Sequence, residues 1–170
     1  MTPLGSTYSW ANDANYSDYS YKIDVPSGSW LRRILIISQN NTTPYPLRAD
    51  DELAGVKLEL PRTGQIIIES AYDDLVAASA IQYGVACTPN ATAGAAADTL
   101  VSVLGTAAFM KGFIIIDLRK YFNPIWGMNL TNYQTGDVKL GLTIENRTGG
   151  DDTIIYWDQL KPVEPEYVGK

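Results

Sequence analysis

Short segments with apolar residues at every second position recur along most of the chain, and they restrict its fold more than any other feature. In residues 137–146, Val138, Leu140, Leu142 and Ile144 alternate mainly with polar residues, which is typical of a strand with one buried face. Most connections between such segments are turns, or loops too short for the crossovers of a parallel sheet. The predicted strands are 19–25, 31–38, 55–60, 65–70, 99–104, 112–118, 137–146 and 153–159.

Eight antiparallel strands in a chain of 170 residues predict an all-β sandwich of two sheets, and we expect the topology of a single jelly roll. The strands fit one β-barrel domain over residues 18–160. Residues 71–87 interrupt the strand pattern and suit a short helix, although 79–87 also fits a strand. The sequence thus predicts a β domain with at most a short helix.

The strand predicted at residues 31–38 is apolar on both faces at its far end, so we expect it to lie deep in the fold. Its basic doublet, Arg32–Arg33, should place the two side chains on opposite faces. The whole chain has 13 basic and 19 acidic residues, which gives a net charge of −6. Because this charge repels phosphate backbones and anionic lipid head groups, we predict no binding to nucleic acid.

Residues suited to catalysis or metal binding are few. The chain has no histidine, which excludes Ser-His-Asp and Cys-His arrangements and histidine-based metal sites. Its one cysteine, Cys87, is interpreted as a packed apolar residue. The acidic clusters Asp50–Asp51–Glu52, Asp73–Asp74 and Asp151–Asp152 lie in predicted loops or in the first turn of the predicted helix, where ordinary structural roles suffice. We predict no enzyme activity, no metal and no cofactor.

The two ends of the chain lack strand periodicity, and the first of them is rich in aromatic residues. We expect residues 1–17 to form a flexible arm, and residues 161–170, which contain two prolines, to form an extended tail. Aromatic side chains on such segments suit subunit interfaces, so we expect a homo-oligomer and, most simply, a homodimer. The candidate interface residues are Tyr8, Trp10, Tyr16, Tyr167 and Val168.

The stretch YKIDVPSGSWLRRILIIS, residues 21–38, contains two strand segments around a Pro-Ser-Gly turn. The first segment has the form x-I-x-V-P, and after the glycine-containing turn the second has the form L-x-R-I-x-I. This hairpin resembles the first hairpin of the capsid jelly rolls of tailless viruses that have an internal membrane. The matching positions are Ile23, Val25, Pro26, Gly28, Leu31, Arg33, Ile34 and Ile36.

This resemblance implies a major capsid protein that is present in the virion and synthesised in the host cytoplasm. Some members of the lineage carry two jelly rolls in one chain, which 170 residues cannot hold. The chain is similar instead to the smaller of the two single-barrel capsid proteins of membrane-containing Thermus phages and haloarchaeal viruses. The resemblance implies a second, larger capsid protein as partner, an internal membrane beneath the shell, and no catalytic residues. The acidic charge favours membrane contact by the partner rather than by this chain.

Two other functions fit the sequence. A carbohydrate-binding or lectin-like sandwich would need the aromatic side chains to line one exposed face. A glycan-acting enzyme would need two of the acidic clusters to converge on one cleft. Both alternatives therefore depend on how the fold arranges these side chains.

Overall fold

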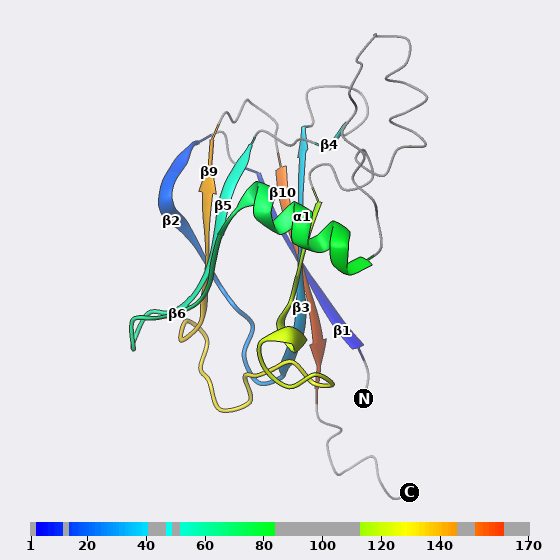
Figure 1. Ribbon diagram of the computed structural model, residues 1–170. Helices are drawn as coiled ribbons and strands as arrows, with labels where there is room; N and C mark the ends of the chain where they lie inside the picture. The colour runs from blue at the N-terminus through cyan, green and yellow to red at the C-terminus, as the bar shows by residue number, and fades with distance from the viewer. Residues whose placement is uncertain are drawn as a thin grey trace, which may run out of the picture.

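Two β-sheets pack face to face, and one helix lies along their side (Figure 1). The computed structural model describes residues 3–11, 14–40, 47–48, 52–83, 113–145 and 152–161. The β3 sheet consists of β1 (Pro3–Ala11), β3 (Trp30–Asn40), β4 (Leu47–Arg48), β7 (Phe113–Asp117), β8 (Met128–Asn129) and β10 (Asp152–Leu160). The β5 sheet consists of β2 (Tyr16–Asp24), β5 (Leu53–Leu60), β6 (Gln65–Ala71) and β9 (Lys139–Ile144).

The order of the longer strands identifies the topology. Eight of the described strands have five or more residues: β1, β2, β3, β5, β6, β7, β9 and β10. Their order is β1-β10-β3-β7 in the β3 sheet and β2-β9-β5-β6 in the β5 sheet, and all their pairings are antiparallel. This interleaving of early and late strands is the order of a jelly roll, in which two Greek keys enclose one core. The predicted fold class and topology are confirmed.

Strand β1 differs from the irregular arm that the sequence predicted over residues 1–17. Its backbone pairs with β10 along its whole length, from Pro3 opposite Leu160 to Ala11 opposite Asp152. The segment lacks a clear apolar alternation, but main-chain hydrogen bonds to a neighbouring strand do not require one. A signal was present, because Thr, Tyr and Trp residues favour strands. The strand predicted at 99–104 lies outside the described residues.

The core lies between the sheets and consists mainly of Ile and Leu side chains. Strand β3 is central in its sheet, with β10 on one side and β4, β7 and β8 along the other. Its residues Leu31, Ile34 and Ile36 are buried, and so is Trp157 on β10. The prediction that residues 31–38 lie deep in the fold is therefore confirmed for one face of the strand, whereas Leu35 and Ile37 on its other face are only partly buried.

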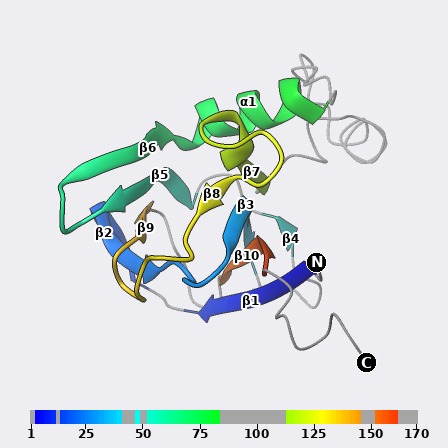
Figure 2. The ribbon, with the colours of Figure 1, turned by 90° about the horizontal axis from the view of Figure 1, so that it is seen from below.

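Helix α1 (Tyr72–Tyr83) closes one side of the sandwich. It has Asp73 and Asp74 in its first turn, as predicted, and it continues through 79–83, where a strand had been the alternative. Figure 2 shows α1 lying beside β6 and β7, which are edge strands of the two sheets among the described elements. The helix therefore bridges the two layers where they would otherwise be open.

Candidate functional site

The outer face of the β3 sheet carries an apolar patch on three of its strands, β7, β3 and β10. Side chains on β7, β3 and β10 alternate between the two faces of the sheet, and residues such as Ile36, Ile114 and Ile155 are buried in the core. The residues between them point outward in two cross-strand rows, Phe113–Ile37–Ile154 and Ile115–Leu35–Tyr156. We call these six residues the apolar face.

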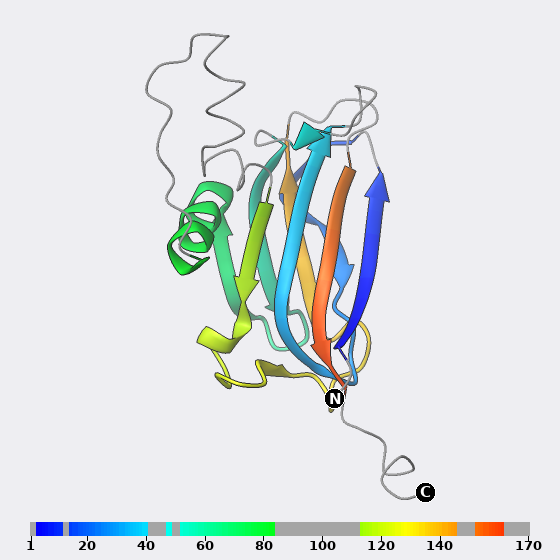
Figure 3. The same cartoon turned by 90° about the vertical axis from the view of Figure 1, so that its right-hand side faces the viewer.

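The apolar face is open to solvent among the described residues. Its members are partly exposed, and Tyr156 is the most exposed of them. Figure 3 shows this side of the sheet, on which β7, β3, β10 and β1 lie side by side and no other described element covers β3 and β10. The outer face of an antiparallel sheet in a two-layer sandwich is normally polar. A contiguous apolar patch there is typical of an interaction surface.

The cross-strand row next to Ile115–Leu35–Tyr156 consists of charged residues and borders the apolar face. Arg33 lies opposite Asp158 in the strand register, and its Nε donates to Oδ2 of Asp158 at 2.6 Å. Arg32 has its Nε 3.9 Å from the same oxygen. The prediction that the two arginines point to opposite faces is wrong, because the register moves from the Arg33–Asp158 pair directly to Leu31–Gln159. Arg32 is thus the extra residue of a β-bulge, which breaks the alternation.

Asp117 lies at the end of β7, in the same cross-strand row as Arg33. Burial alone would raise the pKa of Asp117, but several interactions outweigh it. Arg119, in the short 3-10 helix η1 (Leu118–Lys120), donates from its side chain and its backbone N–H, and Gln82 of α1 donates at 2.7 Å. Together with the charge of Arg119, these bonds lower the pKa of Asp117 to about 2. Asp117 therefore stays ionised and joins α1 to the end of β7.

The outer face of the β5 sheet has the opposite character. Glu59 pairs with Lys22 at 2.5 Å and with Lys57 at 3.3 Å, and Lys139 pairs with Asp24 at 2.9 Å. The hydrogen bond from Lys22 is the main cause that lowers the pKa of Glu59. Since these partly exposed ion pairs are compatible with water, this face needs no cover. The contrast between the two sheets makes the apolar face the stronger candidate for an interaction surface.

A second exposed apolar group lies at one end of the sandwich, in the segment after η1. Tyr121, Phe122 and Ile125 are 60%, 42% and 66% exposed, and we call them the aromatic tip. Asn123 holds the turn, because its side-chain oxygen accepts the backbone N–H groups of residues 125 and 126 at 2.9 Å. The aromatic tip is thus an exposed apolar group on a turn that Asn123 holds, in the segment between η1 and β8.

The interface residues proposed from the sequence are only partly described. Tyr8 and Trp10 lie on β1, opposite Ile155 and Thr153 of β10. Tyr16 begins β2 and packs against the core, with its ring 5.1 Å from that of Tyr21. Tyr167 and Val168 lie outside the described residues. The residues of the apolar face were not among these candidates. The apolar residues on both sides of the strand at 31–38 were the sequence feature that could have indicated it.

A metal site, and an aromatic platform for carbohydrate, find little support in the described part of the chain. No group of three His, Cys, Asp or Glu side chains there could hold a metal ion. The acidic cluster at 50–52 ends in Glu52, which is buried and accepts from Ser38 at 2.9 Å, and residues 50, 51 and 151 lie outside the described residues. The described aromatic residues do not line one face: Trp157 and Tyr72 are buried, whereas Tyr121 and Phe122 are exposed in the aromatic tip. None of the described helices has both the length and the apolar character needed to cross a membrane.

Comparison with known proteins shows a likeness of fold. No family model matches the chain, and no curated protein matches its sequence. Among solved structures, the major capsid protein of Sulfolobus turreted icosahedral virus superposes on 99% of this chain with a TM-score of 0.62 and 19% identity. The chain shares its fold with a viral major capsid protein.

Two more matches come from virus structures. A chain in the atomic structure of the same Sulfolobus virus covers 93% of this protein with a TM-score of 0.62 and 19% identity. The match to the major capsid protein P2 from bacteriophage PM2 covers 95% of this chain, with a TM-score of 0.48 and 13% identity. This chain spans only 45% and 38% of the two Sulfolobus virus chains, less than half of their length.

Proposed function

We propose that this protein is a structural subunit of a viral capsid and acts in the virion. The observation that carries the proposal is the jelly-roll fold shared over 99% of this chain with the major capsid protein of an icosahedral virus. The capsid-like pattern of residues 21–38 gives independent support from the sequence. The prediction that this segment is a hairpin is wrong, because its two strands, β2 and β3, pair with other strands in different sheets. A shell subunit works by packing and needs no catalytic group, which fits a chain without histidine.

The apolar face is the surface on which we expect a neighbouring subunit to pack. Burying partly exposed Ile, Leu, Phe and Tyr side chains removes apolar area from water, at roughly 25 cal/mol per Å². The arginines and Asp158 beside it form a polar border, the arrangement common at protein interfaces. The β5 sheet, with its ion pairs, would stay in contact with water.

The shell is proposed to contain more than this one chain. The chain spans less than half of the matched capsid chains, so an equivalent shell would contain more than the one jelly-roll unit described for this sequence. We infer a homodimer together with a second, larger capsid protein, over an internal membrane. With a net charge of −6 on this chain, the partner is the better candidate for contact with anionic lipid.

The protein composition of virus particles tests the proposal. Particles would be purified on density gradients from cultures that express this sequence, and their proteins quantified by mass spectrometry. We expect this chain in many copies per particle, together with a larger capsid protein of comparable abundance. Its absence from purified particles would contradict the capsid function. High abundance without a second major protein would contradict only the two-protein shell.

A further inference from the structure

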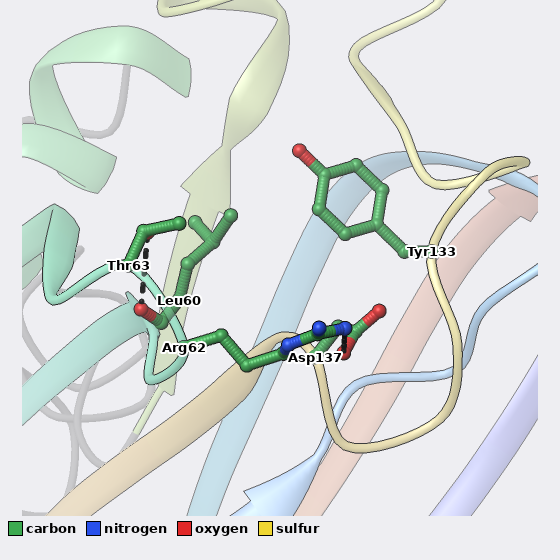
Figure 4. A pocket seen from close by; sticks show the side chains of 5 residues that line it. All are labelled: Leu60, Arg62, Thr63, Tyr133 and Asp137. Atoms are coloured by element: carbon green, nitrogen blue, oxygen red, sulfur yellow. Dashed lines mark hydrogen bonds and ion pairs between the residues drawn. The ribbon is translucent and has the colours of Figure 1, made fainter.

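A cavity of about 310 Å³ opens between the β5–β6 turn and the loop that follows β8 (Figure 4). Its lining residues are Leu60, Arg62, Thr63, Tyr133 and Asp137. None of them belongs to the apolar face or the aromatic tip, so neither of those surfaces accounts for the cavity. Ligand pockets in proteins span roughly 300–1,000 Å³, and this volume at the lower limit suits one small ring.

The polar groups of the cavity are a fixed carboxylate and an adjustable guanidinium group. Arg62 Nη1 lies 3.5 Å from Oδ1 of Asp137, and the other carboxylate oxygen of Asp137 accepts the backbone N–H of Gln134 at 2.9 Å. The carboxylate is thus oriented by its own loop, whereas the Arg62 side chain is 77% exposed and can adjust to a ligand. At 3.5 Å the pair is loose, which leaves guanidinium N–H groups available to a ligand.

The walls of the cavity are apolar and aromatic. Figure 4 shows Tyr133 on one side and Leu60 and Thr63 on the other, with Arg62 and Asp137 between them. Thr63 Oγ1 lies 3.3 Å from the carbonyl of Leu60, which helps to hold the turn. A ring with one apolar face and hydroxyl groups at its rim would match an aromatic wall and a donor–acceptor pair.

We propose that this cavity binds a single neutral sugar residue. Hydroxyl groups of the sugar accept from Arg62 and donate to Asp137, while its apolar face packs on Tyr133 and Leu60. A neutral ligand is favoured over a phosphate or a carboxylate because the two charges of the pair cancel. The inference goes beyond the capsid function and does not depend on it.

Saturation-transfer difference NMR with the full-length protein tests the inference, because it detects weak ligands on large assemblies. The probes are the methyl glycosides of glucose, galactose, mannose and N-acetylglucosamine. At least one should give a saturable signal with a dissociation constant on the order of 1 mM, since a dozen heavy atoms make few contacts. Arg62→Gln should weaken that binding about 10-fold or more, because it removes a charged hydrogen-bond donor.

Two further variants complete the design. Asp137→Asn removes the acceptor charge and should weaken binding in the same way, whereas Glu69→Gln removes a partly exposed charge from an ion pair outside the cavity and should leave it unchanged. Unfolding midpoints equal to that of the wild type would show that the variants are folded. The inference is overturned if none of the four glycosides gives a saturable signal, or if Arg62→Gln and Asp137→Asn bind as tightly as the wild type. Neither result would bear on the capsid function, which is tested separately by the protein composition of the particles.

Discussion

The side-chain oxygen of Ser79 lies 3.1 Å from both the amide nitrogen and the carbonyl oxygen of Ile115. Ser79 is buried on α1, and Ile115 is the middle residue of β7, the edge strand on that side of the β3 sheet among the described elements. The hydroxyl accepts from the N–H of Ile115, and its own hydrogen can reach the carbonyl of Ile115 or of Leu75. A helix side chain therefore occupies the place of a neighbouring strand and protects this edge from pairing with another chain.

Ser79→Ala should lower the free energy of unfolding by about 1–3 kcal/mol, because it leaves the partly buried N–H of Ile115 without its acceptor. Urea denaturation at neutral pH measures the effect. Ser70→Ala is the matched control, since the Ser70 hydroxyl makes only a 3.4 Å contact with the adjacent carbonyl. The control should change stability by less than about 0.5 kcal/mol. Equal losses in the two variants would contradict the role of Ser79 at the edge.

Asp117→Asn should destabilise the protein at neutral pH but much less in acid. The side chain of Asp117 is 2% exposed and its folded pKa is about 2, against an ordinary value of 3.8. The ionised form therefore contributes about 2 kcal/mol to stability. Because the folded pKa is the lower one, this contribution is complete above the ordinary pKa and is lost as the pH falls from 3.8 through 2.

Unfolding curves of the wild type and of Asp117→Asn at several pH values test this prediction. The stability difference between the two proteins should be constant near neutral pH and should shrink by about 2 kcal/mol on acidification to about pH 2. Asp73→Asn, at an exposed position in the first turn of α1, serves as the control. A difference that does not vary with pH would show that the Arg119 and Gln82 bonds do not lower the pKa of Asp117.

Gly127→Ala should destabilise the protein more than Gly64→Ala. Both glycines have positive φ, +79° and +69°, so each substitution introduces backbone strain, which costs about 1 kcal/mol or more. A Cβ at Gly127 would lie 2.8 Å from the Cα of Arg32, in the bulge of β3, whereas a Cβ at Gly64 would meet nothing within 4 Å. Thermal unfolding measures both. If the two losses were equal, the loop at Gly127 would not be packed against the bulge.

Ile37→Lys should prevent formation of the proposed oligomer without unfolding the subunit. Ile37 lies in the apolar face, where a lysine would place a charge in the proposed subunit contact. Ile66→Lys is the matched control, because Ile66 is 49% exposed on β6, outside the apolar face. Sedimentation velocity at micromolar concentration should show monomers for Ile37→Lys and oligomers for the wild type and Ile66→Lys. An unchanged sedimentation coefficient for Ile37→Lys would place the contact elsewhere.

Local periodicity was enough to predict the class of fold. Residues 137–146 and 153–159 alternate so regularly that their strands were recognised from sequence, and they correspond to β9 and β10. The sandwich then followed from the number of strands and the short connections between them. The helix at α1 was one of two alternatives, because residues 79–87 have a periodicity that fits both a helix and a strand.

Features that depend on pairing between distant segments were not predictable in this way. Strand β1 is defined by its backbone bonds to β10, which lies about 150 residues further along the chain. The bulge at Arg32 is defined by the register with β10, and a single strand contains no information about register. The cavity joins the turn at 60–63 to the loop at 133–137, and neither segment has the whole set of lining residues.

The strand at 31–38 combines a feature that is predictable from the sequence with one that depends on tertiary packing. That both faces of this strand are apolar can be read from its residues alone. Which face is buried depends on the packing of the two sheets: Ile34 and Ile36 lie in the core, whereas Leu35 and Ile37 point outward with the rest of the apolar face. The physical reason is that a hydrophobic pattern specifies which side chains are unfavourable in water, but not whether the chain itself or a partner will cover them.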